Sequence, residues 1–165
     1  MTTLVIARYN EDLTWLNLVG GYNLVVLDKA QLGNHGREAG SYLHFILQHY
    51  ASLRGDYVFC QGDPFVHCPE FDAVVGFRRF YGPRLQCDWR GAPHHPGLPI
   101  GEAVNFLHLQ KLPEMLEFTS GAQFMASAEQ IRRVLPSQYE RAAVYANTEH
   151  GPWVLERLWD YLIPA

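Results

Sequence analysis

The order of apolar segments in the first third of the chain constrains its fold more than any other feature. Residues 3–7, 23–28 and 57–60 form three short apolar runs, as in the buried strands of a parallel sheet. A long helix is expected between the last two runs, because apolar residues recur there at helical spacing. Its stripe consists of Ala39, Tyr42, Leu43, Ile46, Leu47 and Tyr50. With a shorter helix between the first two runs, the β-α-β-α-β order predicts an α/β fold, a three-layer sandwich with a mostly parallel sheet.

The shorter helix is expected directly after the first strand. Asn10 is a suitable N-cap, and Glu11 and Asp12 would stand in the first turn, where the helix dipole favours acids. Gly20 and Gly21 then end the segment before the second strand begins. We therefore expect a right-handed βαβ unit at the start of the chain.

The middle of the chain has a different character. Residues 64–99 are rich in proline and glycine, and apart from a helix expected over residues 69–77 we predict irregular structure there. Residues 116–119 and 122–126 are expected to form strands that meet at Ser120-Gly121.

Three helices are expected at the end of the chain. Ser127 and Gln130 form a capping box for a helix that runs to residue 135, and Pro136 restarts a helix that runs to residue 146. Gly151 and Pro152 begin the last helix, which has one apolar face. No segment has the composition of a linker, so residues 1–165 are expected to form a single domain.

Composition excludes several classes of protein. Of the 165 residues 48% are apolar and 18% charged, as in an ordinary globular protein. The net charge of −4 gives no electrostatic drive toward nucleic acid. No apolar run approaches the roughly 20 residues of a membrane span, and no signal peptide is expected at the amino terminus. Three cysteines without paired spacing make a disulfide framework improbable and predict a cytoplasmic protein.

The end of the third strand is the first candidate for a functional site. Gln61, Gly62 and Asp63 follow it directly, and in open α/β sheets ligands bind at this carboxyl edge. The Asp63 carboxylate is suited to hold a divalent cation that bridges diphosphate oxygens, and Gln61 is suited to hydrogen-bond a ligand. The alternatives are that Asp63 is an N-cap or turn acid before Pro64 and that Gln61 satisfies backbone groups.

The start of the long helix is the second candidate, and we expect it to face the same edge. Asn34 precedes it, Gly36 leaves free backbone N–H groups that favour an anion, and Arg37 adds a fork-shaped donor. Glu38 is suited to pair with Arg37, to cap the helix or to bind an acceptor hydroxyl. The alternative is an ordinary capped helix with a local ion pair.

Other residue types carry weaker signals. The zinc-ligand types Cys60, His67, Cys68, Cys87, His94 and His95 are present. They lack the spacing of a zinc site, so buried free thiols and surface histidines are the preferred interpretation. Glu156 on the last helix is a candidate base near a cleft, and the alternative is a solvated acid paired with Arg157 or a neighbouring turn.

Several segments together resemble one family. Residues 5–16 (VIARYNEDLTWL) resemble the opening of the domain of unknown function 3431, a glycosyltransferase-like family of bacteria and fungi. Residues 36–39 with Tyr42 and Leu43 resemble its helix motif, and residues 58–65 with His67 resemble its strand-end motif. Residues 121–124 and 156–159 are similar, more loosely, to nucleotide-sugar transferases of the GT-A fold.

This resemblance implies transfer of a sugar from a nucleotide-diphosphate donor to an unknown acceptor. It implies manganese or magnesium as cofactor, with Asp63 as the metal-binding acid and Glu156 or Glu38 as the base. The residues expected to bind substrate are Arg8, Asn10, Glu11, Asp12, Asn34, Arg37, Gln61 and His67.

Two other functions stay open. The family pattern has Asp-x-Asp at the strand end, whereas this chain has Gln61-Gly62-Asp63, which favours a non-catalytic module that binds a sugar, nucleotide or protein. A metal-dependent hydrolase that uses Asp63, His67 and the His94-His95 loop is the third hypothesis.

Overall fold

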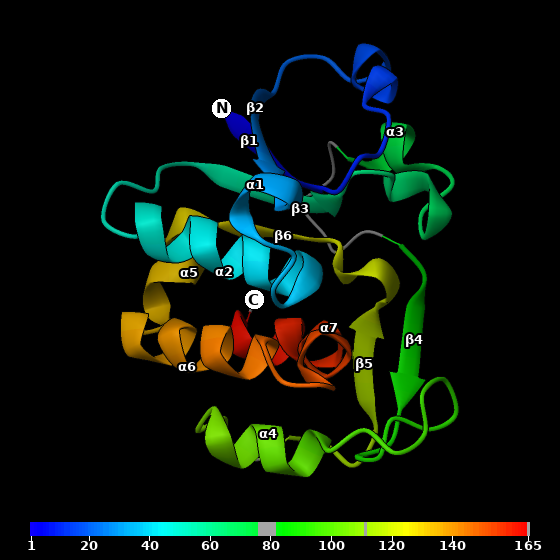
Figure 1. Cartoon of the computed structure of the whole chain (residues 1–165), viewed down its shortest axis with the longest axis vertical. Helices are drawn as coiled ribbons and strands as arrows, with labels where there is room; N and C mark the ends of the chain where they lie inside the picture. The colour runs from blue at the N-terminus through cyan, green and yellow to red at the C-terminus, as the bar shows by residue number, and fades with distance from the viewer. Residues whose placement is uncertain (76–81, 111, 165) are drawn as a thin grey trace.

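A computed structural model describes residues 1–75, 82–110 and 112–164 (Figure 1). Its centre is a four-stranded sheet in the order β2-β1-β3-β6. The strands are β1 (Thr2–Arg8), β2 (Asn23–Asp28), β3 (Asp56–Gln61) and β6 (Phe124–Ser127). The first three strands run parallel and β6 pairs antiparallel with β3. The predicted α/β class with a mostly parallel sheet is confirmed.

Strand β1 lies between two parallel neighbours and is the most deeply buried. Residues 4–7 are inaccessible to solvent, and Val5 lies opposite Val25 on one side and Phe59 on the other. Because side chains alternate along a strand, Val5 and Ala7 join one apolar core while Leu4 and Ile6 join a second core on the opposite face. This burial on both faces explains why the strand is apolar throughout.

Helices cover one face of the sheet in successive layers (Figure 1). Helices α1 (Lys29–Leu32) and α2 (Arg37–His49) lie next to the sheet, and α2 packs on β1 and β3. Helices α6 (Pro136–Ala146) and α7 (Gly151–Leu162) pack behind α2. The remaining helices on this side are α4 (Ile100–Phe106) and α5 (Ala128–Arg133).

Short 3-10 helices and one short α-helix cover the opposite face (Figure 1). They are η1 (Thr14–Leu18), η2 (Pro64–Val66) and α3 (Phe71–Val74). Trp15 from η1 packs edge-on against Phe65 and Phe71, with ring centroids 5.9 and 5.7 Å away. Helix α3 begins at Phe71 and ends at Val74, so it is shorter than the helix predicted over residues 69–77. Residues 76 and 77 of that prediction lie outside the described residues.

A second sheet corrects the prediction for the middle of the chain. Strand β4 (Arg84–Cys87) lies in the segment expected to be irregular, and it pairs antiparallel with β5 (Leu116–Thr119). The expected second strand, residues 122–126, appears as β6, and it belongs to the first sheet. The two predicted strands therefore do not pair with each other, because η3 (Ser120–Ala122) carries the chain from one sheet to the other.

The first helix also differs from the prediction. It begins at Thr14, and Asn10 is not its N-cap but has a left-handed φ of 65°. The Asp12 carboxylate accepts hydrogen bonds from the backbone N–H and hydroxyl of Thr14, each at 2.9 Å, and these bonds lower the pKa of Asp12. This local turn competes with a helix that starts at Asn10. By contrast, the capping box at Ser127 and the starts of α2, α6 and α7 are confirmed.

Candidate functional site

Five of the predicted site residues meet in one cleft of about 290 Å³. The cleft lies where the first turns of α2 and α7, the end of β3 and η3 come together. Its walls are Arg37, Glu38, Ala39, Gln61, His67, Gly121, Ala122, Pro152, Trp153 and Glu156. The expectation that the start of α2 faces the carboxyl edge of the sheet is confirmed. The fold also places Glu156 of α7 beside these residues, although α7 lies far from them in the sequence.

The backbone at the start of α2 is tightly constrained. Gly36 has a φ of 68°, and a Cβ there would lie 2.8 Å from the Cβ of Ala146, so only glycine fits. Arg37 also has a positive φ, of 51°, which costs a non-glycine residue roughly 1–3 kcal/mol. Its guanidinium lies over the ring of Trp153, 5.4 Å from the centroid. Ala122, on the opposite wall, shares this uncommon conformation, with a φ of 52°.

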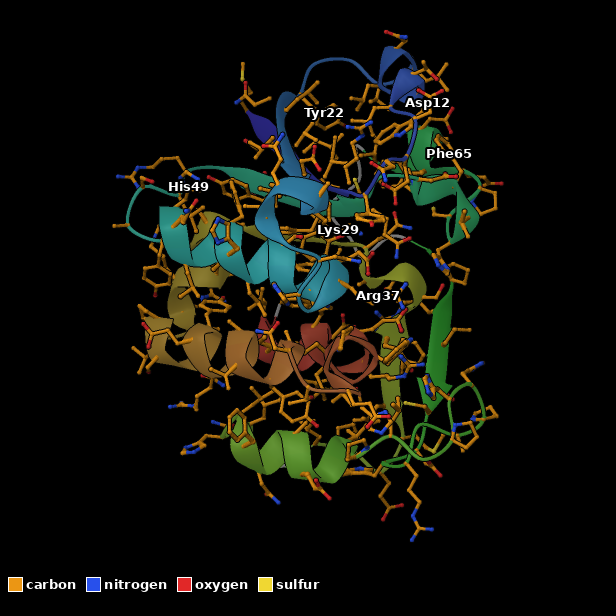
Figure 2. The ribbon with its side chains drawn as sticks, in the orientation of Figure 1. Asp12, Tyr22, Lys29, Arg37, His49 and Phe65 are labelled. Atoms are coloured by element: carbon orange, nitrogen blue, oxygen red, sulfur yellow. The ribbon has the colours of Figure 1, made fainter. Side chains whose placement is uncertain are left out.

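Glu38 forms an ion pair that the sequence analysis missed. The Nζ of Lys29 lies 2.7 Å from its Oε1, whereas the Nε of Arg37 lies 3.8 Å from its Oε2. Figure 2 labels Lys29 and Arg37, at the starts of α1 and α2. Burial alone would raise the pKa of Glu38, but the hydrogen bond and charge of Lys29 outweigh it and hold this pKa below its ordinary value. The signal available in the sequence was the position of Lys29, directly after β2 at the same sheet edge.

Glu156 is held by two donors. Its Oε1 accepts the backbone N–H of Gly121 at 2.6 Å, and its Oε2 accepts a hydrogen bond from Arg157. Arg157 is buried, donates to the carbonyl of Trp153 at 2.7 Å and lies 4.6 Å from the ring centroid of Phe118. Glu156 therefore lines the cleft and also pairs with Arg157 and a neighbouring turn. Its role as a base stays a prediction.

His67 packs against the backbone of η3. Gly121 has a φ of 79°, and a Cβ there would lie 2.6 Å from the ring of His67. This close approach requires glycine and fixes the loop whose N–H group binds Glu156. His67 therefore lines the cleft from η2 while its ring covers Gly121.

Asp63 lies outside the walls of this cleft. It is exposed and caps η2, where its carboxylate accepts the N–H of Phe65 at 3.1 Å, which is the turn role considered for it. Within residues 1–75, 82–110 and 112–164, no three His, Cys, Asp or Glu side chains form a group that could hold a metal ion. One exposed carboxylate that already caps a helix does not fit a divalent ion held by the protein alone. The metal role of Asp63 stays a prediction.

The segment from Arg8 to Asp12 lies beside the end of β3 and not in the cleft wall. The Nε of Arg8 donates to the carbonyl of Glu11 at 2.9 Å, and Glu11 also accepts the N–H of Tyr9. The carboxylate of Glu11 lies so close to Gly62 that a Cβ there would be 2.5 Å from it. Nucleotide binding by this segment, including Asn10, is not tested by the geometry.

The remaining candidates are dispersed. Asn34 is exposed in the turn before α2. Cys60, Cys68 and Cys87 are free and buried, as the preferred interpretation has them. His94 packs edge-on against Phe118 and His95 against Trp153.

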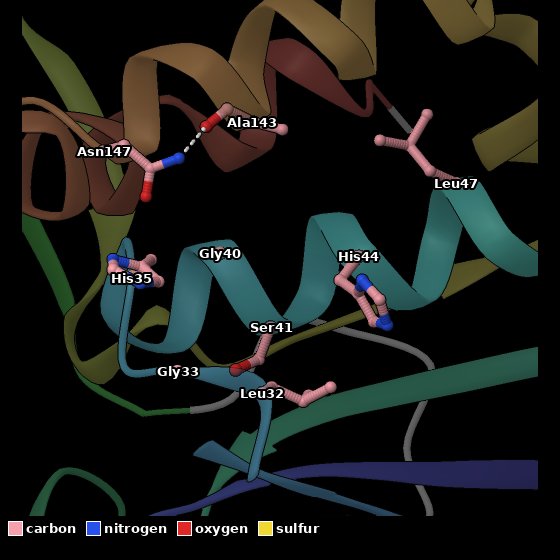
Figure 3. A pocket seen from close by; sticks show the side chains of 9 residues that line it. All are labelled: Leu32, Gly33, His35, Gly40, Ser41, His44, Leu47, Ala143 and Asn147. Carbon is pink, nitrogen blue, oxygen red and sulfur yellow. Dashed lines mark hydrogen bonds between the residues drawn. The ribbon is translucent and has the colours of Figure 1, made fainter. Parts of the chain in front are cut away.

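A second pocket of about 240 Å³ lies beside the outer part of α2 (Figure 3). His35 and His44 lie at opposite ends of it, and Asn147 donates to the carbonyl of Ala143 at 3.0 Å. None of the nine residues that line it is an Asp, Glu, Arg or Lys. The first cleft, which combines an arginine with two carboxylates, is therefore the stronger candidate for a polar ligand.

The chain matches no protein-family model, no curated protein and no solved structure. None of the helices in the described part of the chain is long and apolar enough to cross a membrane.

Proposed function

We propose that the cleft binds the sugar-diphosphate part of a nucleotide sugar and that the protein transfers this sugar to an acceptor hydroxyl. The observation that carries the proposal is the meeting of Arg37, Glu38, Gln61, His67 and Glu156 at the carboxyl edge of the parallel strands. All five are among the site residues that the sequence predicts. Ligands of open α/β sheets bind at this edge.

Two helix starts and the local charges support an anionic ligand. The first turns of α2 and α7 both contribute to the wall, and free N–H groups and helix dipoles favour anions there. Three cations, Lys29, Arg37 and Arg157, neighbour the two carboxylates, which leaves one net positive charge. Arg37 is half-exposed and is free to leave Trp153 for a phosphate, to which it can donate two hydrogen bonds.

The size of the cleft supports a part of the ligand rather than the whole. About 290 Å³ is at the lower end of the roughly 300–1,000 Å³ of small-molecule sites. We place the sugar and phosphates in the cleft, with the ring of Trp153 as a surface for the sugar. The nucleoside would extend along the segment from Arg8 to Asp12, as the family resemblance implies.

The proposed reaction uses Glu156 as the base. The acceptor oxygen forms a bond to the anomeric carbon while the bond from that carbon to the diphosphate breaks. The acceptor proton moves to the Glu156 carboxylate, and the nucleoside diphosphate leaves with the bonding electrons. Glu38 is less suited to this role, because the hydrogen bond and charge of Lys29 hold its pKa below the ordinary value in spite of burial. Arg37 and the helix starts would stabilise the charge on the leaving diphosphate.

A non-catalytic binding module is the second candidate, and one observation favours it. Both oxygens of Glu156 already accept hydrogen bonds, from Gly121 and Arg157, so both are engaged by the protein itself. For the hydrolase, Asp63, His94 and His95 lie outside the cleft that contains His67. No observation favours that third function.

Thermal unfolding with nucleoside diphosphates and nucleotide sugars, with and without manganese, tests the proposal. A ligand at a hundredfold excess over its Kd adds about 2.7 kcal/mol of stability, or about 5–10 °C in Tm for a chain of this size. Arg37→Gln should weaken binding about tenfold or more. Arg133→Gln on the exposed side of α5 is the matched control and should leave binding unchanged.

Turnover separates the two candidates. Release of nucleoside diphosphate that is lost in Glu156→Gln, with binding retained, would support the transferase. A Tm shift without turnover in the wild type would support the binding module. If neither nucleoside diphosphates nor nucleotide sugars shift the Tm, the proposal is wrong. A shift that requires manganese would support the metal role predicted for Asp63.

A further inference from the structure

Lys29 is a buried ammonium with unused hydrogen-bonding capacity. Only 4% of its surface is exposed, and Glu38 is its one hydrogen-bond or ion-pair partner in the described part of the chain. An ammonium group has three donors, so two remain without an acceptor among these described residues. A buried charge is costly unless it is paired, and Lys29 therefore depends on Glu38 remaining ionised.

The two carboxylates of the cleft differ in their surroundings. Glu38 is paired through its Oε1 with the buried ammonium of Lys29, at 2.7 Å. Glu156 instead accepts from a backbone N–H and an arginine of its own helix. A carboxylate that stays ionised and keeps one orientation is suited to accept hydrogen bonds from hydroxyl groups rather than to take up a proton.

We propose that Lys29 is a positioning residue that keeps Glu38 ionised and oriented toward the cleft, where Glu38 accepts hydrogen bonds from the hydroxyl groups of the sugar. This inference rests on the proposed function, because it assigns the sugar end of the same ligand. The carboxylate repels phosphate, so the diphosphate lies toward Arg37 and the start of α7 and the hydroxyl groups lie toward Glu38.

Several ionisable groups surround Glu38 besides Lys29 of α1. Arg37 and Tyr42 lie on its own helix, and the hydroxyl of Tyr42 is within electrostatic range of the Glu38 carboxylate. Glu156 of α7 and His67 line the same cleft. Because these groups neighbour Glu38 from several elements, the test compares each variant with the wild type over the whole pH range.

The pH dependence of nucleotide-sugar binding, measured by calorimetry from about pH 5 to pH 8, tests the role of Lys29. Lys29→Met leaves the mostly buried Glu38 without its nearest cation, and only the more distant Arg37 remains, so the pKa of Glu38 should rise. Affinity should then fall about tenfold or more toward low pH and recover at high pH, relative to the wild type. Lys29→Arg should restore the wild-type profile, and Lys29→Met combined with Glu38→Gln should abolish the additional pH dependence.

A second comparison does not depend on Lys29→Met folding. Glu38→Gln should weaken binding of a nucleotide sugar about tenfold but should not weaken binding of the corresponding nucleoside diphosphate, since only the sugar donates hydrogen bonds to Glu38. Equal affinity of Glu38→Gln and wild type for the nucleotide sugar would overturn the inference and leave the proposed function intact. A Lys29→Met variant with lower stability but the wild-type pH profile would also overturn it. If the wild type binds none of these ligands, the proposed function fails and the inference fails with it.

Discussion

Replacing Tyr42 with phenylalanine is expected to stabilise the protein, which is unusual for a change in the core. Tyr42 is inaccessible to solvent, and its ring packs edge-on against Phe59 and Phe124 at centroid distances of 5.3 and 5.9 Å. Its hydroxyl has no hydrogen-bond partner among the described residues. Burial also raises the pKa of this hydroxyl far above its ordinary value, so it stays protonated. The ring is therefore well packed while the oxygen is not compensated for its lost hydration.

The size of the expected stabilisation follows from the cost of leaving a buried polar group unpaired, which is about 1–3 kcal/mol. Tyr42→Phe removes that group and keeps the ring, so the free energy of unfolding should rise by about 1 kcal/mol or more. Tyr139 provides the matched control, because it is equally buried but donates to the carbonyl of Ile131 at 2.9 Å. Tyr139→Phe loses this bond and should lower the free energy of unfolding by about 1 kcal/mol.

Thermal and urea unfolding of the two variants measure this difference directly. For a chain of this size, 1 kcal/mol corresponds to about 2–4 °C in Tm, so the two variants should move in opposite directions by several degrees in total. If Tyr42→Phe lowers the Tm as much as Tyr139→Phe does, the reasoning is refuted. The Tyr42 hydroxyl would then have a partner such as a buried water.

Two further changes test the backbone and the charges of the cleft. Gly121→Ala should lower the free energy of unfolding by about 1–3 kcal/mol more than Gly97→Ala in thermal unfolding. Both glycines have positive φ, but only at Gly121 does the added Cβ meet a ring, that of His67; equal losses would contradict the clash. Because the pKa of Glu38 is lowered in the folded state, its stabilisation is complete above the ordinary value of 4.5 and is lost as pH falls through the folded value. Urea unfolding should therefore show the wild type losing more stability than Glu38→Gln below about pH 4.5, and parallel curves would contradict the ion pair with Lys29.

Local sequence patterns were sufficient for the elements that depend on near neighbours. The stripe of α2, the capping box at Ser127 and the start of α6 at Pro136 all act within one or two helical turns. For the same reason the sequence indicated Arg37 and Gln61 as site residues, because each lies at the end of its element. Glu156 instead lies in the middle of α7, and its place beside them is set by the fold. The failure at Asn10 was also local, since the Asp12–Thr14 turn competed with the helix.

Only the tertiary structure decided which distant segments meet. Strand β4 has four residues of alternating exposure and no distinctive pattern, so its pairing with β5 depends on packing against the rest of the fold. The partner of Glu38 is likewise decided by the fold, which brings Lys29 from the end of β2 to the first turn of α2. Hydrophobic periodicity determines which face of an element is buried, but burial is non-directional and does not specify which polar groups face one another. The sequence by itself thus determined the elements with strong local patterns and the sheet edge of the site, while the fold determined the pairing of β4 and the charges that surround each carboxylate.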